Sequence, residues 1–110
     1  MKLFVYGSLK SGYYNHKILG KSKFLGLATI PGYTLFDAGL YPVAIPTNNP
    51  DESFIEGEVY EIDYHVWSIV LEIETMAGYR QTVYEDLHFF EYKDWLKAME
   101  RFKHIGSRWI

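Results

Sequence analysis

The sequence predicts one α+β domain over residues 1–110, built as a small mixed β-sheet or barrel with flanking helices. A chain of 110 residues is long enough for one hydrophobic core but not for two. Apolar residues make up 48% of the chain and aromatic residues 18%, a composition typical of globular proteins. Segments with strand character predominate along the chain, and segments with helical spacing are interspersed among them.

The N-terminal part of the chain predicts a strand, a turn and a short helix. The apolar run in Lys2–Tyr6 is typical of a strand, and a loop rich in glycine follows it as far as Gly12. The next segment, Tyr13–Leu19, predicts a short helix that ends at Gly20. In Phe24–Phe36 apolar and β-branched residues surround a central Pro-Gly pair, which indicates two strands or one sharply bent strand.

The middle of the chain predicts a second turn, a loop and a strand. The turn Gly39-Leu40-Tyr41-Pro42 could place an aromatic ring against a pocket. The polar segment Thr47–Ser53 predicts an exposed loop or a lid. The segment Ile55–Ile62 alternates in side-chain type and predicts a strand with mixed faces.

The C-terminal half predicts two helices separated by strand. Asp63 is a suitable N-cap for a helix from about Tyr64 to Thr75. The segment Gln81–Tyr92 predicts one or two strands. Apolar side chains then recur at helical spacing, so that Lys93–Lys103 is expected to form an amphipathic helix.

Composition excludes several classes of function. The formal net charge of −3 argues against a general nucleic-acid-binding protein, which normally carries a basic surplus. The absence of cysteine excludes disulfides, thiolate nucleophiles and cysteine-ligated metals. The four histidines lie at spacings that match no common metal site, so no metal is expected: His16, His65, His88 and His104. Neither a signal peptide nor a membrane span is recognisable, so the expected location is the cytoplasm, without a membrane partner.

The end of the first predicted strand is a candidate anion site. The apolar run stops at Tyr6-Gly7-Ser8-Leu9, and a strand that ends at a glycine can turn its next backbone N–H groups outward. Successive outward N–H groups form a small concavity that binds anions without a charged side chain. The same string is also compatible with an ordinary strand-to-loop turn.

Glu74 stands out in the predicted helix after Asp63. Stepping 100° per residue places it one turn after Val70 and two turns after Val66, within the apolar arc that should face the core. Glu72, by contrast, falls on the opposite, polar side. A carboxylate buried without a partner is costly, so it pairs, takes up a proton or lines a cavity.

Three interpretations of Glu74 remain open from the residues alone. It could bend out to water, because the helix is near its end. It could pair with Arg80. It could also face a pocket and act as a base, since a partly desolvated glutamate has a raised pKa that suits proton transfer near neutral pH.

An ordered set of segments resembles the γ-glutamylcyclotransferase-like family, which includes γ-glutamylamine cyclotransferases and many small bacterial, archaeal and phage relatives. The similarity covers nearly the whole length of the chain. It is carried by Tyr6-Gly7-Ser8-Leu9, Phe24-Leu25-Gly26, Gly39-Leu40-Tyr41-Pro42-Val43-Ala44, Ile55-Glu56-Gly57-Glu58-Val59-Tyr60 with Ile62-Asp63, Glu74 followed by Tyr79-Arg80, and Gly106-Ser107-Arg108-Trp109.

The resemblance implies a compact β-barrel with a pocket beside the first-strand turn. It also implies that the chain releases 5-oxoproline from a small-molecule γ-glutamyl-amine or γ-glutamyl-peptide, without a cofactor. The family's catalytic glutamate falls on Glu74. The implied substrate-binding residues are Tyr6, Gly7, Ser8, Leu9, Tyr41, Tyr79 and Arg80.

Two other functions are compatible with these residues. A member of the same fold could bind a small carboxylate without catalysis and act as a regulator or interaction module. A serine hydrolase using Ser8 would need a nearby histidine base, and the sequence places none of the four histidines there.

Overall fold

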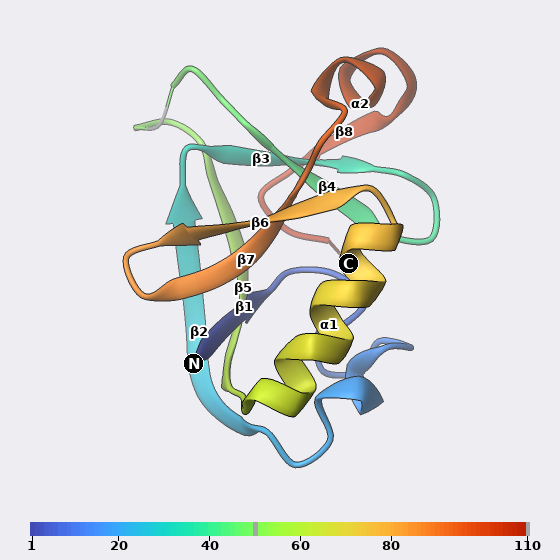
Figure 1. Cartoon of the computed structure of the whole chain (residues 1–110). Coiled ribbons are helices and arrows are strands. Elements are labelled where there is room, and N and C mark those ends of the chain that lie inside the picture. The colour runs from blue at the N-terminus through green and yellow to red at the C-terminus, as the bar shows by residue number, and fades with distance from the viewer. Residues whose placement is uncertain (50, 110) are drawn as a thin grey trace.

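The computed structural model describes residues 1–49 and 51–109. The described elements are eight strands, two α-helices and one short 3-10 helix (Figure 1). In chain order they are β1 (Lys2–Val5), η1 (His16–Leu19), β2 (Lys23–Pro31), β3 (Tyr33–Asp37), β4 (Pro42–Pro46), β5 (Phe54–Glu61), α1 (Tyr64–Met76), β6 (Tyr79–Tyr84), β7 (Leu87–Tyr92), α2 (Trp95–Arg101) and β8 (Lys103–Gly106).

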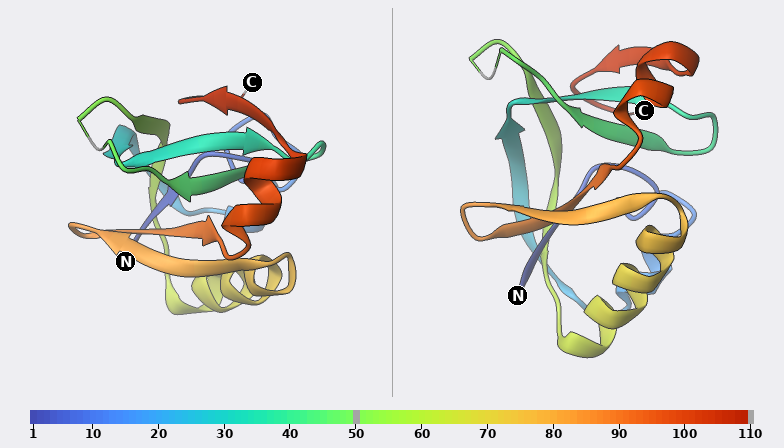
Figure 2. Two further views of the ribbon diagram at one scale, coloured as in Figure 1. Left: turned by 90° about the horizontal axis from the view of Figure 1, so that it is seen from above. Right: turned by 45° about the horizontal axis from the view of Figure 1, so that its top comes forward.

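The strands form two sheets. The larger has five strands in the order β2-β5-β1-β7-β6, and the smaller has three in the order β4-β3-β8. Only β1 and β7 pair in parallel among the described strands; the remaining pairs are antiparallel. Figure 2 shows the small sheet on one side of the β6–β7 hairpin and α1 on the other. The expected α+β fold with a mixed sheet is confirmed, but the described strands do not close into one hydrogen-bonded barrel.

Strand β1 lies in the middle of the large sheet and is buried on both faces. Because successive side chains of a strand point to opposite sides, its residues contribute to two separate cores. Leu3 and Val5 pack in one core with Val70 of α1, while Phe4 and Tyr6 pack in the other. The central strand therefore ends at a fixed place between the two cores, and the turn that follows it is held there.

The neighbouring strand β5 approaches β1 so closely that it needs a glycine. A Cβ atom built on Gly57 would lie 2.3 Å from the Val5 carbonyl oxygen and 2.7 Å from the Phe4 ring. No side chain fits at such distances, so Gly57 allows the two strands to lie against each other.

Helix α1 begins at the expected cap. The Asp63 side chain accepts a hydrogen bond from the Val66 N–H at 2.8 Å, which satisfies a free donor of the first turn. The predicted helix is confirmed, with its end one residue later at Met76. Of the arc predicted to face the core, Val70 is fully buried, whereas Ile73 is exposed.

Some boundaries differ from the expectations and others agree with them. The Lys93–Lys103 helix is confirmed only as the shorter α2, because the chain becomes extended at Phe102 and continues as β8 against β3. The turn at Gly39–Pro42 leads directly into an unpredicted strand, β4, which pairs with β3. The residues Phe24–Phe36 form two strands, which confirms one of the two predicted alternatives. The loop predicted at Thr47–Ser53 includes Pro50, which lies outside the described residues.

Within the part of the chain that the structure describes, neither helix has the length and apolar character needed to cross a bilayer.

Candidate functional site

A cavity of about 200 Å³ lies where the turn after β1 meets the end of α1. Its wall also includes the start of β4, the first residue of β6, Phe90 of β7 and the loop after the turn. Of the residues proposed from the sequence, Tyr6, Gly7, Ser8, Leu9, Tyr41, Glu74 and Tyr79 all line this cavity. The fold thus brings together residues that are up to 73 positions apart, from Tyr6 to Tyr79.

The turn after β1 is held by its carbonyl groups and leaves its amides free. The Gly7 carbonyl accepts from the Lys10 N–H at 2.9 Å, and the Ser8 carbonyl accepts from the Asn15 N–H at 3.0 Å. The Asn15 side-chain amide also donates to the Ser8 hydroxyl at 3.0 Å. Among the described residues, none accepts a hydrogen bond from the N–H groups of Gly7, Ser8 or Leu9. These three donors are available to a ligand.

Gly7 is needed because β4 begins directly against it. A Cβ atom on Gly7 would lie 2.9 Å from Cδ of Pro42 and 3.0 Å from its Cγ. The φ of Gly7 is not positive, so the crowding by Pro42, and not a left-handed backbone, requires glycine here. The Tyr79 hydroxyl donates to the Pro42 carbonyl at 2.6 Å, so the residue packed on the turn is itself held in place.

Glu74 is half-buried and lines the cavity from the last turns of α1. Its carboxylate takes part in no hydrogen bond or ion pair with any residue from 1–49 and 51–109. Burial is the cause that raises its pKa from the usual 4.5 to about 7. Of the three interpretations, the bend into bulk water and the pairing with Arg80 are wrong, and the carboxylate faces a pocket.

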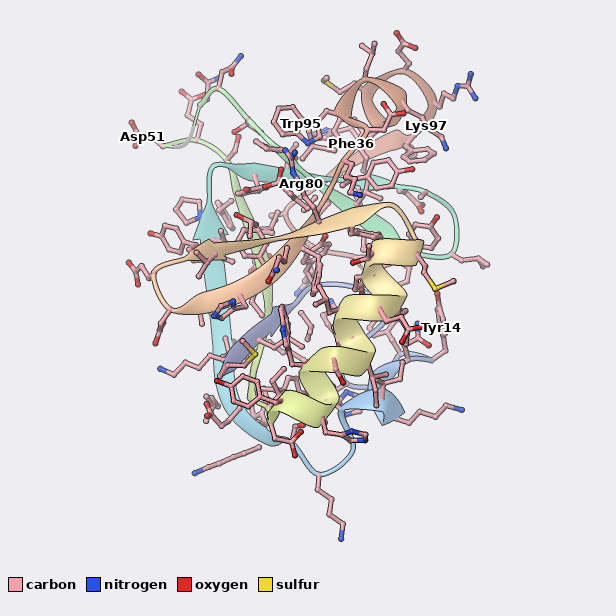
Figure 3. The ribbon with its side chains drawn as sticks, viewed as in Figure 1. Tyr14, Phe36, Asp51, Arg80, Trp95 and Lys97 are labelled. Carbon is pink, nitrogen blue, oxygen red and sulfur yellow. The ribbon has the colours of Figure 1, made fainter. Side chains whose placement is uncertain are left out.

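Arg80 is not brought into the cavity. It follows Tyr79 on β6, and because neighbouring side chains of a strand alternate in direction, the two point to different sides. The Arg80 guanidinium donates to the Glu91 carboxylate at 3.0 and 3.2 Å and lies over the Trp95 ring at 5.3 Å (Figure 3). Strand pairing places Arg80 opposite Glu91, which explains why it is held there.

Tyr6 and Tyr79, two tyrosines of the cavity wall, remain uncharged. Burial raises the pKa of Tyr6 and of Tyr79 well above the usual value of 10.0. Their hydroxyls donate to the carbonyls of Phe90 and Pro42 respectively. Both rings therefore serve as fixed, neutral walls, and Tyr41 packs near Tyr79 with 6.2 Å between ring centroids.

The serine-hydrolase interpretation of Ser8 lacks its base. The side-chain partner of the Ser8 hydroxyl is Asn15, whose amide cannot take up a proton at neutral pH. His16 is the histidine nearest in sequence, and its Nδ1 lies 2.9 Å from the Leu9 carbonyl oxygen instead.

Some residues of the cavity were not foreseen from the sequence. They are Leu3, Phe4, Val5, Tyr14, Asn15, Pro42, Ile73, Ala77 and Phe90. For Ala77, the C-cap of α1, a signal existed, since it follows Glu74 by three residues, the spacing that places helix side chains on one face. No sequence signal pointed to Asn15 or Tyr14, because a periodic pattern does not predict the path of a loop.

The chain is similar to known proteins of one family. Residues 3–99 match the family model described as gamma-glutamyl cyclotransferase, AIG2-like. The chain is 35% identical over 78 residues to the gamma-glutamylcyclotransferase family protein YtfP of Escherichia coli, a match that covers 71% of this chain. That match spans 66% of the length of the E. coli protein, slightly under two thirds.

Solved structures show the same fold. The crystal structure of an uncharacterized protein from Pyrococcus horikoshii has a TM-score of 0.81 and 30% identity, covering 96% of this chain and 86% of its own. An AIG2-like protein from mouse has a TM-score of 0.72 over 96% of this chain and 86% of its own, and at 22% identity it shows the fold alone.

The buried charge of Glu74 predicts a pH-dependent effect of its removal on stability. A carboxyl whose pKa is higher in the folded state than in the unfolded state destabilises the fold as pH rises through 4.5 to about 7. Glu74→Gln removes this charge. As pH rises from 4 to 8, the free energy of unfolding of the Glu74→Gln protein should therefore increase relative to that of the parent protein, by at most about 3 kcal/mol. Urea denaturation at several pH values measures the difference.

Glu72→Gln is the matched control, because it removes an exposed carboxylate from the same helix. A difference between Glu74→Gln and the parent protein that stays constant over this pH range would contradict the burial of the Glu74 charge.

Proposed function

Because the chain belongs to the gamma-glutamyl cyclotransferase, AIG2-like family, we propose that it releases 5-oxoproline from γ-glutamyl-amines or γ-glutamyl-peptides. The observation that carries this proposal is the convergence of two groups on one cavity. These are the half-buried Glu74 carboxylate, which has no protein partner among the described residues, and the turn with three free amide donors. One group can accept a proton near neutral pH and the other can hold a carboxylate.

The turn is the proposed seat of the substrate α-carboxylate. The N–H groups of Gly7, Ser8 and Leu9 would donate to its oxygens, as successive amides do in other anion sites. Hydrogen bonds to a charged acceptor are about twice as strong as neutral ones. The tyrosine walls and Phe90 would enclose the acyl chain, and no cofactor takes part.

Glu74 is the proposed general base. The substrate α-ammonium supplies a cation that would compensate the otherwise unpaired carboxylate. Glu74 would then remove one proton from this ammonium, which frees the amine lone pair to attack the γ-carbonyl carbon. Proton transfer by a positioned group contributes typically about 10²–10⁴-fold to the rate, and a pKa near the working pH favours it.

The ring closure balances without a further reactant. The new C–N bond closes the five-membered ring, and the bond from the γ-carbon to the leaving nitrogen breaks. The ring nitrogen gives up a second proton as the lactam forms. The leaving nitrogen takes up this proton and the one held by Glu74, so that the amine departs as an ammonium ion and the carboxylate is restored. Holding the substrate folded would add to the rate, since a well-oriented intramolecular attack saves on the order of 7–11 kcal/mol at best.

Arg80 has no part in this proposal. It was expected to bind substrate, but its guanidinium is engaged by Glu91 and does not line the cavity.

Glu74→Gln should abolish turnover while binding persists. The amide keeps the size of the side chain but cannot accept the proton, so 5-oxoproline release should fall by about 10²–10⁴-fold. The assay measures 5-oxoproline from a panel of γ-glutamyl-amines and γ-glutamyl-amino acids, and calorimetry measures binding. Glu72→Gln, on the exposed side of the same helix, should retain parental rates.

A Glu74→Gln protein as active as the parent would remove this residue from the mechanism. If the parent protein binds these compounds but releases no 5-oxoproline, the domain is instead a binding module for small carboxylates.

Gly7→Val should weaken substrate binding. Its side chain would press on the Pro42 ring and displace the turn that carries the amide donors. Overpacking of this kind costs typically about 1–3 kcal/mol, so the Kd for substrate should rise by at least about fivefold. Thr29→Val is the control, because it places the same side chain at an exposed strand position. Unchanged affinity in a folded Gly7→Val protein would contradict the role of the turn.

A further inference from the structure

An exposed apolar rim surrounds one side of the cavity mouth. Tyr14 and Ile73 line the cavity and yet are 57% and 40% exposed, and Leu40, next to Tyr41 of the wall, is 76% exposed. We call these three residues the rim. They come from three separate segments: the loop after β1, the turn before β4, and the end of α1.

Two of the three rim segments are joined by a hydrogen bond, and the third reaches the same cavity. The Tyr14 hydroxyl donates to the Leu40 carbonyl at 3.4 Å, which joins two of the segments. Figure 3 shows Tyr14 beside the C-terminal half of α1, and Ile73 of this helix lines the same cavity. Single exposed apolar side chains need no explanation, but a cluster at the mouth of a pocket is typical of a binding surface.

The size of the cavity decides which half of a substrate meets the rim. Pockets that enclose a drug-sized ligand measure roughly 300–1,000 Å³, and this one has about 200 Å³. The acyl half occupies the interior beside Glu74, so the leaving amine must extend to the mouth. This step rests on the proposed function.

The electrostatics of the mouth disfavour a negatively charged leaving group. Among the described residues that line the cavity, Glu74 is the only one that is Asp, Glu, Lys or Arg. The last turn of α1 carries no basic residue, and the C-terminal end of a helix is partially negative. Two cations that the sequence places near the wall residues are engaged elsewhere: Lys10 donates to the Trp109 carbonyl, and Arg80 to Glu91.

We propose that the rim is a subsite for the leaving amine, selective for an apolar or aromatic amine that bears no carboxylate. The apolar body of such an amine covers Tyr14, Leu40 and Ile73, whereas a γ-glutamyl-amino acid would bring its α-carboxylate to a cavity whose described lining residues include no lysine or arginine. The preferred substrates are thus γ-glutamyl conjugates of aralkyl or alkyl amines.

Three compounds separate the two parts of this preference. γ-Glutamyl-phenethylamine and γ-glutamyl-phenylalanine differ only in the carboxylate, and γ-glutamyl-ethylamine lacks only the phenyl ring of the first. The kcat/KM for 5-oxoproline release should be at least about tenfold higher for the phenethylamine conjugate than for either of the others. Calorimetry with Glu74→Gln should give the same order of affinities.

A rim variant tests the location of the subsite. Ile73→Lys places a cation at the mouth, so the ratio of kcat/KM for γ-glutamyl-phenylalanine to that for γ-glutamyl-phenethylamine should rise about tenfold. Val83→Lys is the matched control: Val83 is 54% exposed on β6 and does not line the cavity. The ratio for this control should stay at the parental value.

The possible failures are distinguishable. If 5-oxoproline is released from all three compounds at equal kcat/KM, or fastest from γ-glutamyl-phenylalanine, the rim proposal is wrong and the proposed function stands. If none is turned over but calorimetry gives the expected order, the proposed function is wrong and the rim still selects apolar ligands. Equal affinities without turnover would overturn both.

Discussion

The candidate site depends on one energetic constraint, a carboxylate held in an apolar cavity without a protein partner among the described residues. Glu74 lies one turn after the fully buried Val70, so the same helical face that anchors α1 also carries the charge inward. Such a group remains charged at neutral pH only if something else compensates it, and burial accordingly raises its pKa to about 7. The apolar wall therefore gives this carboxyl a pKa that suits the base role proposed for it.

The position of β1 supplies the second half of the site. As the central strand with both faces buried, it cannot shift without disturbing two cores. The close contact at Gly57 leaves no room for β1 to move toward β5. The turn beyond it is then fixed from the other side by Pro42, which Tyr79 holds by its carbonyl. The free amides are therefore rigidly placed relative to α1, which favours a site that is formed before the ligand arrives.

Local patterns predicted much of this arrangement. Helical periodicity singled out Glu74 over Glu72, the Asp63 cap marked where α1 begins, and alternation identified β5. Strand pairing could not be predicted. Arg80 lies opposite Glu91 only because of the register of β6 with β7, so the sequence did not reveal the ion pair that keeps Arg80 out of the cavity. For the same reason β8 and β4 were missed, since short strands of the small sheet form through partners distant in sequence.

The central claim concerns the protonation of a single side chain, and NMR tests it directly. Carboxyl ¹³C chemical shifts of the glutamates, assigned to Glu74 by comparison with the Glu74→Gln protein, would be followed between pH 3 and pH 9. The account predicts a midpoint for Glu74 near pH 7 in the unliganded protein. A midpoint at the ordinary value of 4.5 would show a carboxylate in free contact with water, and would contradict the account.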